Sequence, residues 1–465
     1  MKEEENCKEE EIVSQNEMSQ EDESVEEDPY SRYSPARKRV FVAVVALAVF
    51  LSPSSSMAFL PAAKDIASQF NTKVVTIHLS VAMYTVVMAI SPCLAAPLGD
   101  IYGRRSMFLI CTLGFTAASA LTAESQNLAM FFVFRCVTAL FGTAFFSLGG
   151  SVVGDIYIPQ ERGNAMGWTL LGSQLGPAFA PVIGGIIATY TSWRVIFWVL
   201  TGLGGLTGAA AFFFLPETSR NLKYKQVQKE TGKKFVWVKF NPFTVAMSLR
   251  YPNLVLGGCM SMSLVYSMYS MTTPIPNVVD PRFGLNTPLQ SSLFYLAPGC
   301  GYLLGSIFGG RWADRYVRLY IKLRGKRVPE DRLRSTHGSF IALPITILIY
   351  GWSIEKEVGG IPLPVIALFF NGVAQTFCFP SLNAYCIDCL PHLGGAGIAS
   401  SYFTRFIAGA IGSATCLIQI EHIGVGWTST ISAFVLLGGY TACLVLITFG
   451  GKIREAALER DGIEI

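Results

Sequence analysis

The chain has 465 residues, of which 51% are hydrophobic and only 15% are charged, and its mean hydropathy is +0.43. This composition excludes a single soluble domain of the same length, whose surface would need far more charged side chains. After residue 35, apolar runs of about 20 residues recur, and each can cross about 30 Å of bilayer hydrocarbon as a helix. The sequence therefore predicts an all-α polytopic membrane protein.

The first 36 residues differ from the rest. Thirteen of the 32 acidic residues lie within residues 1–30, against only Lys2 and Lys8. The segment lacks the apolar core of a signal peptide. We predict a disordered acidic tail over residues 1–36.

Twelve transmembrane helices are predicted in chain order. They cover residues 39–62, 74–96, 106–123, 128–153, 163–188, 194–215, 254–274, 289–310, 337–353, 362–385, 396–419 and 427–449. A basic loop separates the first six helices from the last six. The predicted domains are an N-terminal six-helix bundle (37–218), a cytoplasmic linker (219–253), a C-terminal six-helix bundle (254–450) and a C-terminal tail (451–465).

Basic residues predict the orientation, because Lys and Arg accumulate in cytoplasmic loops. Eight lie in residues 219–253 and nine in residues 311–335. With the N-terminus inside, the outer loops carry only Lys64, Lys73, Arg194, Arg282 and Lys356. Both termini are therefore expected in the cytoplasm.

Acidic residues recur at equivalent places in the two halves. Asp100 follows the second span and Asp314 the eighth, while Asp155 follows the fourth and Asp388 the tenth. Such a repeat indicates two pseudo-symmetric bundles, with a substrate site between them near the middle of the membrane.

The segment Ala96-x-x-x-Asp100-x-x-Gly103-Arg104-Arg105 resembles the loop signature of the major facilitator superfamily, with Ala96 in place of its usual Gly and Ile101 in place of its usual Arg. The resemblance implies a latch between the two halves on the cytoplasmic side. A basic loop that merely flanks the membrane is the alternative. The predicted gating residues are Asp100, Gly103, Arg104, Arg105, Asp155, Arg162, Asp314, Arg315 and Asp388.

The fifth span carries glycines and prolines at the spacing of the family's antiporter motif. These residues are Gly163, Gly172, Gly176, Pro177, Pro181, Gly184 and Gly185. Glycine at helical spacing lets another helix approach closely, and proline bends a helix. In the family this motif accompanies antiporters, which favours export. Generic helix packing would use the same residues without implying a direction.

Other segments narrow the resemblance to fungal 12-span drug:proton antiporters. They include Leu215-Pro216-Glu217-Thr218, Ser292 to Gly299 and Val328 to Arg334. The last two resemble the branch that contains itaconate and secondary-metabolite exporters. The resemblance runs from about Arg37 to the end of the twelfth span.

Two arginines lie deep inside predicted spans. Arg135 matches the arginine of the family's fourth-span motif, which implies a role in proton coupling or anion binding. A structural arginine bonded to carbonyls of the first span is the alternative. Arg405 lies in the eleventh span. A guanidinium is costly in hydrocarbon, so each should face a wet cavity or a partner. Together they could bind a carboxylate.

Polar and aromatic side chains at helical spacing suggest further cavity-lining positions. The predicted substrate and proton pathway consists of Arg135, Arg405, Ser55, Ser56, Gln174, Tyr266, Tyr269, Tyr295, Asn371, Gln375 and His78. Each stripe could instead serve interhelical packing or hydrogen bonding. His78 could carry the coupling proton, or it could be an interfacial histidine.

These observations predict a proton-coupled antiporter that exports a small organic acid, secondary metabolite or drug. Its partners would be the substrate, protons and the bilayer, without nucleic acid, and it would act as a monomer in the plasma membrane. No metal site, cofactor or enzymatic activity is expected, because no nucleotide-binding, zinc or hydrolase motif occurs. The alternatives are an uptake symporter or facilitator on the same fold, and a sensor that lost transport.

Overall fold

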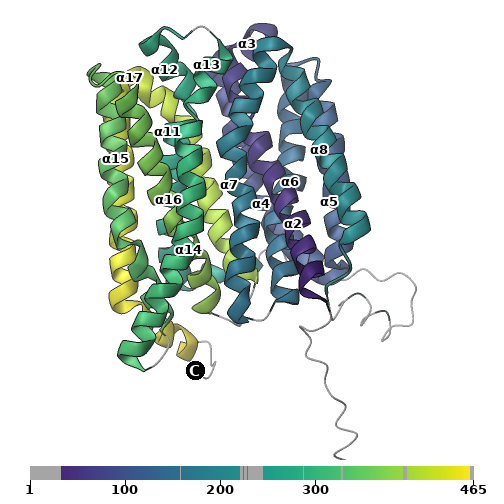
Figure 1. The fold of residues 1–465 in the computed structure, drawn as a ribbon, viewed down its shortest axis with the longest axis vertical. Coiled ribbons are helices and arrows are strands. Elements are labelled where there is room, and N and C mark those ends of the chain that lie inside the picture. Colours follow the sequence, from purple (N-terminus) through teal and green to yellow (C-terminus); the bar gives the residue numbers. More distant parts are fainter. Residues whose placement is uncertain are drawn as a thin grey trace, which may run out of the picture.

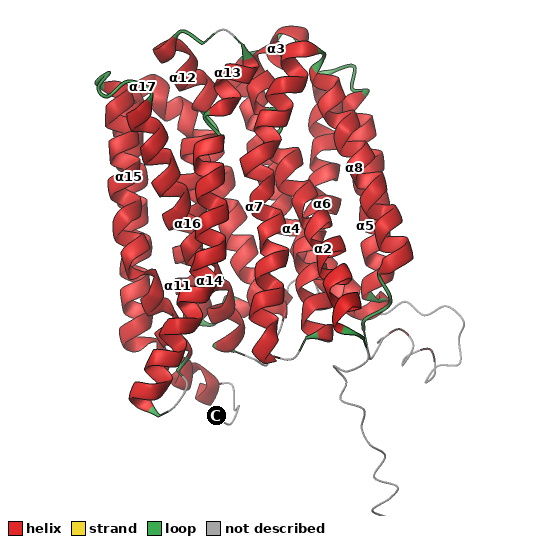
Figure 2. Cartoon of the chain, in the orientation of Figure 1, coloured by secondary structure: helices red, strands yellow, loops and turns green. Residues whose placement is uncertain are grey.

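The computed structural model describes residues 33–157, 159–219, 224, 228, 244–285, 287–325, 328–390 and 395–460. This part of the chain is helical throughout, with short connecting turns (Figure 2). Most of the predicted acidic tail and of the predicted linker lies outside the described residues.

The N-terminal half begins where the side chain of Ser34 caps the first long helix, by accepting a hydrogen bond from the backbone N–H of Arg37 (3.5 Å). Gly103 joins two helices with φ +102°, in the region that favours glycine. The elements are α2 (Pro35–Met57), η1 (Leu60–Ala62), α3 (Ala63–Gln69), α4 (Val74–Tyr102), α5 (Arg104–Ala123), α6 (Leu128–Ile156), α7 (Pro159–Tyr190) and α8 (Trp193–Phe214).

The C-terminal half follows with α10 (Thr244–Ser248), α11 (Pro252–Thr272), α12 (Ile275–Phe283), α13 (Pro288–Leu293), α14 (Leu296–Arg324), η2 (Pro329–Thr336), α15 (His337–Glu355), α16 (Pro362–Asp388) and α17 (Gly395–Arg460). Gly424 interrupts α17 with φ +82° and ψ 172°, so this element consists of two helices. The carboxylate of Glu355 accepts the backbone N–H of Val425 (2.9 Å) and caps the second of them.

Eleven of the described helices, counting α17 once, are long and apolar enough to cross a membrane. With α17 divided at Gly424, these helices account for the twelve predicted spans. The division falls between the predicted spans 396–419 and 427–449. The protein is therefore a multi-pass membrane protein.

The two halves lie side by side in Figure 1, with α2 to α8 on one side and α11 to α17 on the other. They meet along two seams, one formed by α7 against α13 and α14, the other by α4 against the first part of α17. Small residues bring the first seam close, since a Cβ on Gly299 of α14 would lie 2.5 Å from the Cα of Ala178 of α7.

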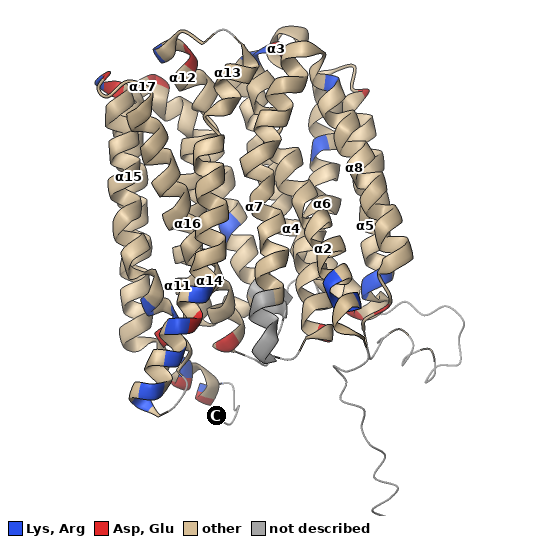
Figure 3. Ribbon diagram, in the orientation of Figure 1, with Lys and Arg blue, Asp and Glu red and all other residues tan. Residues whose placement is uncertain are grey.

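Lys and Arg concentrate at one end of the molecule (Figure 3). We call the end that carries Asp100, Arg104, Arg105 and the last turns of α14 the basic end, and the end with α3, α12 and α13 the opposite end. The side of the membrane that each end faces remains a prediction from charge.

Candidate functional site

Arg135 lies on α6, seven residues after the start of this helix at Leu128, and is only 1% exposed. Its Nη1 donates a hydrogen bond to the carbonyl oxygen of Ser55 on α2 (3.2 Å). The guanidinium carbon lies 4.0 Å from the ring centroid of Phe59 and 4.9 Å from that of Tyr84. These rings stabilise the cation through their π faces. The bond to Ser55 is the structural role that the sequence left open for Arg135.

That bond leaves much of the guanidinium unused. Its Nε and Nη2 are buried and have no hydrogen-bond partner among the described residues. Ser55 and Ser56 on α2 place their hydroxyls beside those of Tyr84 and Tyr269. Leaving buried donors such as Nε and Nη2 unpaired costs about 1–3 kcal/mol each, and more for a charged group. The arrangement therefore offers a ready site for a ligand that accepts hydrogen bonds.

The C-terminal half contributes tyrosines to the same centre. Tyr84 on α4 and Tyr269 on α11 lie near the guanidinium of Arg135, and Tyr269 is in turn a neighbour of Tyr302 on α14. The hydroxyl of Tyr302 is buried without a partner in the described structure. The structure thus brings together Arg135, Ser55, Ser56 and Tyr269 of the predicted pathway. Tyr84 is an additional member, which charge, motif and helical stripe do not mark in the sequence.

Arg405 has separate surroundings. It lies on α17, is 7% exposed, and its Nη2 donates to the side-chain oxygen of Asn383 on α16 (2.8 Å). The ring centroids of Phe379 and Tyr402 lie 4.5 Å and 4.8 Å from its guanidinium carbon. The described contacts of Arg135 and Arg405 share no residue.

An apolar cluster between the two halves connects these two environments. It consists of Tyr84, Met88, Ala89, Ala139, Tyr402 and Phe406. Tyr84 contacts Arg135 and Tyr402 contacts Arg405, while Phe146 of α6 packs its ring 5.3 Å from that of Tyr402. Each arginine therefore flanks a different side of one aromatic contact between the halves.

Three of the other predicted pathway residues form bonds between helices of the C-terminal half. Asn371 donates to the hydroxyl of Thr346 on α15 (2.9 Å), Gln375 donates to the carbonyl oxygen of Leu264 on α11 (2.6 Å), and Tyr295 donates to that of Thr272 (2.9 Å). These are the interhelical hydrogen bonds that the stripe pattern left open as an alternative.

The remaining three pathway residues have varied surroundings. Tyr266 on α11 is 8% exposed, and its backbone lies against Gly412 of α17. Gln174 on α7 is half-buried. His78 on α4 is buried, and neither of its ring nitrogens has a hydrogen-bond partner among the described residues.

The glycines of α7 lie where the helix touches its neighbours. A Cβ on Gly172 would overlap the carbonyl oxygen of Ala46, and one on Gly176 would lie 2.9 Å from the backbone nitrogen of Ser54. A Cβ on Gly184 would lie closer still to the carbonyl oxygen of Ala58. These three positions require glycine because α7 packs directly on the backbone of α2.

The last glycine of the motif serves the contact between the halves. A Cβ on Gly185 would lie 2.5 Å from the hydroxyl of Ser292 and 2.9 Å from the carbonyl oxygen of Pro288 on α13. Pro177 and Pro181 lie within α7. Gly163 and Arg162 also belong to α7, but their contacts lie outside the described part of the structure.

At the basic end of the N-terminal half, Arg104 connects the two predicted acids. Its Nη2 forms an ion pair with Asp100, and its Nε lies 3.5 Å from a carboxylate oxygen of Asp155. Glu217, which follows α8, accepts the backbone N–H groups of Arg104 (2.8 Å) and Arg105 (3.2 Å). Glu217 belongs to the Leu-Pro-Glu-Thr segment, but the sequence did not identify its bonding role.

The C-terminal half repeats this arrangement. Arg332 of η2 lies 3.4 Å from a carboxylate oxygen of Asp314 and 3.5 Å from one of Asp388. In each half, one arginine thus joins an acid on one helix to an acid on another, Asp100 on α4 to Asp155 on α6 and Asp314 on α14 to Asp388 on α16. The guanidinium of Arg315, a predicted gating residue, lies 5.9 Å from the ring centroid of Trp312. The ion pairs named here each join an acid and an arginine of the same half.

Polar contacts between the halves occur at the opposite end. The Nζ of Lys64 on α3 lies 2.7 Å from a carboxylate oxygen of Asp280 on α12, and Ser291 of α13 also donates to Asp280. The backbone N–H of Leu289 donates to the hydroxyl of Thr189 on α7 (3.1 Å). These bonds, together with the contact at Gly185, join the halves at this end.

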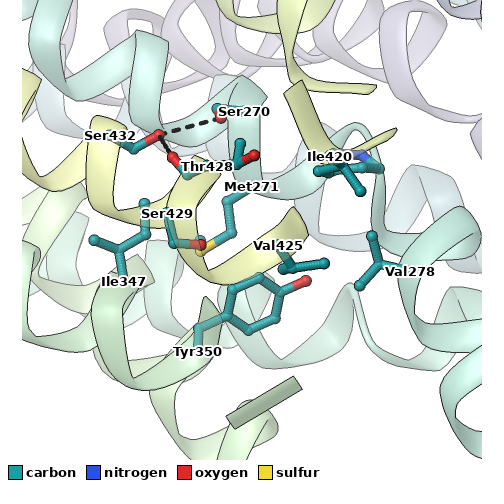
Figure 4. Close-up of a pocket in the computed structure, with 11 residues that line it drawn as sticks. Ser270, Met271, Val278, Ile347, Tyr350, Ile420, Val425, Thr428, Ser429 and Ser432 are labelled. Atoms are coloured by element: carbon teal, nitrogen blue, oxygen red, sulfur yellow. Dashed lines mark hydrogen bonds between the residues drawn. The ribbon is translucent and has the colours of Figure 1, made fainter. Parts of the chain in front are cut away.

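A small cavity near the opposite end of the C-terminal half is too confined for cargo. Tyr350, Met271 and Ser429 border it, and Ser432 hydrogen-bonds to Ser270 beside it (3.2 Å; Figure 4). It offers about 10 Å³ to the centre of a water molecule, which is room for one water at most.

Comparisons with known proteins agree with this architecture. The sequence model described as "Major Facilitator Superfamily" matches residues 45–413. The chain is 29% identical to the "MFS-type transporter phiD" of Fungal sp. (strain ATCC 74256), an alignment that covers 94% of this chain and 72% of the relative. It is 29% identical to the "Efflux pump radE" of Floropilus chiversii, with 91% and 82% covered. It is 27% identical to the "MFS-type transporter hepF" of Aspergillus oryzae, with 91% of each chain covered.

The fold also resembles a solved structure, that of the human organic anion transporter MFSD10 (TETRAN). The TM-score is 0.63 at 16% sequence identity, covering 88% of this chain and all of the other. Twelve helices in two halves, the paired acid–arginine networks and the match over residues 45–413 lead to one conclusion. The chain belongs to the Major Facilitator Superfamily and is a membrane transporter.

Proposed function

We propose that this transporter exports a small organic anion, such as an organic acid or an acidic secondary metabolite, in exchange for protons. The observation that carries the proposal is the buried Arg135, whose Nε and Nη2 lack hydrogen-bond partners in the described structure while aromatic and hydroxyl side chains surround it. A carboxylate or phenolate of the cargo would accept hydrogen bonds from these nitrogens and offset the charge.

The apolar part of such a cargo would lie against the rings around the site. Tyr84, Tyr269 and Tyr302 provide aromatic surface and hydroxyls from both halves. An amphipathic anion matches this combination, because it carries one acidic group on an apolar body. The efflux pump radE and the human organic anion transporter, to which this chain is similar, favour by their names the same direction and class of cargo.

Export would proceed by alternating access. The polar bonds between the halves lie at the opposite end, which would therefore be closed in this conformation. Cargo would bind or leave at the basic end. Because Lys and Arg accumulate on the cytoplasmic side, the basic end would face the cytoplasm. The opposite end would then separate to release cargo outside, while the networks around Arg104 and Arg332 would move together at the cytoplasmic side. We place the transporter in the plasma membrane, acting as a monomer.

The test is a flux assay in sealed vesicles with an imposed pH gradient and a panel of dicarboxylates and lipophilic aromatic acids. Removal of a hydrogen bond to a charged group costs about 1.5–3 kcal/mol. We therefore expect Arg135→Gln to lower proton-dependent flux about 10- to 150-fold, with normal insertion. Arg194→Gln is the control, because Arg194 also lies over an aromatic ring (Trp193, 4.6 Å) but at the opposite end. Wild-type flux in Arg135→Gln would refute the role of this arginine.

A further inference from the structure

A second and larger cavity lies on the outside of the C-terminal half, at the basic end. Its volume is about 460 Å³, and α14, the start of α15 and α16 line it. It is separate from the centre around Arg135, because none of its lining residues contacts that arginine in the described structure. The lining residues that matter here are Trp312, Tyr316, Tyr320, Arg334, His337 and Gly338. We call this cavity the α14–α15 groove.

The groove lies where the chain leaves the hydrocarbon. Leu304, Ile307 and Phe308 of α14 are exposed apolar side chains, 41%, 42% and 54% exposed, and they precede the first charge of this helix, Arg311. Ile341 and Ile345 of α15 are exposed to a similar degree. These side chains form the lipid-facing surface next to the groove. Trp312 and Tyr316 come directly after it, at the level where aromatic side chains anchor proteins in the membrane interface.

Arg334 is the arginine that lines the groove. It shares the carboxylate of Asp331 (3.1 Å) with Arg324 (3.3 Å), which lies outside the lining, so Asp331 offsets the charge of two arginines. Arg334 lies over the ring of Tyr320 (4.9 Å), and Arg315 lies over that of Trp312 (5.9 Å). Among the described residues, no acidic side chain lines the groove. Basic pockets between transmembrane helices are suited to anionic headgroups.

We propose that the α14–α15 groove binds the headgroup of an anionic membrane phospholipid. The phosphate of the headgroup would lie against Arg334, and its second anionic group would extend toward Arg315, which lies outside the lining but over the ring of Trp312. The glycerol would lie against Trp312 and Tyr316. The acyl chains would follow the exposed isoleucines of α15 and the apolar face of α14 into the hydrocarbon. This inference does not depend on the cargo or on proton coupling.

The test uses full-length protein in nanodiscs that contain phosphatidylcholine and phosphatidylserine in a ratio of four to one. Native mass spectrometry then counts the lipids that remain bound after release from the disc. A Cβ on Gly338 meets no atom within 4 Å, so Gly338→Trp fills the groove without removing a charge. The matched control is Gly438→Trp, because Gly438 is also an exposed helical glycine with open space around it.

The expected result is that wild type and Gly438→Trp retain phosphatidylserine several-fold above its share of the disc, and Gly338→Trp does not. A charge variant provides a second measurement, with Arg315→Gln expected to lower this enrichment and Lys356→Gln to leave it unchanged. Lys356 also lies over a tryptophan of the same protein (Trp352, 5.7 Å), but at the other end of α15. Equal retention of the two lipids by wild type, or unchanged enrichment in Gly338→Trp, would overturn the proposal.

Discussion

Two adjacent glycines of α7 make different contacts, one within their own half and one with the other half. Substituting each glycine in turn therefore tests the two kinds of contact separately. Gly184 touches the backbone of α2 in its own half, whereas Gly185 touches α13 in the other half. Substitution of Gly185 by alanine should therefore disfavour only the conformation in which the opposite end is joined. The same change at Gly184 should disfavour the folded N-terminal half in every conformation.

The size of the effect follows from the contacts. A Cβ at position 185 would lie 2.5 Å from the hydroxyl of Ser292, which is fully buried, and 2.9 Å from the carbonyl oxygen of Pro288. Neither neighbour can move freely, and overpacking of this kind costs about 1–3 kcal/mol. That free energy corresponds to a shift of about 5- to 150-fold in the ratio of the two conformations.

Hydrogen–deuterium exchange of α12 and α13 would measure this shift, because segments that separate from a neighbour exchange faster. We expect Gly185→Ala to increase exchange over residues 275–293 with little change in thermal midpoint, and Gly184→Ala to lower the midpoint. Gly167→Ala is the control on the same helix, since its Cβ would meet nothing within 4 Å. Identical exchange in Gly185→Ala and wild type would refute a contact that depends on conformation.

Three further changes test other parts of the structure. Glu217→Gln weakens two hydrogen bonds to backbone N–H groups and should lower the free energy of unfolding by about 1–3 kcal/mol. The control is Glu357→Gln, which should leave the thermal midpoint unchanged because the ion-paired side chain of Glu357 is 70% exposed. Gly424→Ala places a Cβ 2.8 Å from a carboxylate at φ +82° and should lower the midpoint in detergent, whereas Gly438→Ala should not. Asp280→Asn removes the ion pair at the opposite end and should increase proteolysis there, and an unchanged cleavage pattern would contradict its role in joining the halves.

The sequence predicted the features that have a fixed local signature. The lengths of the apolar runs predicted the transmembrane spans. The glycine spacing of the fifth span identified positions where α7 does touch α2. The recurrence of acids also indicated two equivalent halves, and the structure shows an arginine at the centre of each pair. These signals lie within a few residues of one another, so periodicity and motif spacing can reveal them.

Contacts between distant segments could not be derived in the same way. Asn371 lies on a polar stripe of its helix, but only the position of α15 decides that it bonds to Thr346 and does not face the centre. Arg332 meets Asp314 because η2 folds back beside α14, which the sequence spacing of 18 residues does not reveal. Helical periodicity gives the face on which a side chain lies, and the packing of the bundle determines which neighbour it meets.

The aromatic surroundings of Arg135 have a consequence for energy coupling. A guanidinium keeps its proton throughout the physiological range, and the rings of Phe59 and Tyr84 that surround it do not ionise at those pH values either. The centre therefore presents the same electrical sign to its cargo in an acidic and in a neutral compartment. The affinity of this centre for a weak acid therefore depends on whether the acid is ionised. The acid is released most readily on the side of the membrane where it becomes neutral.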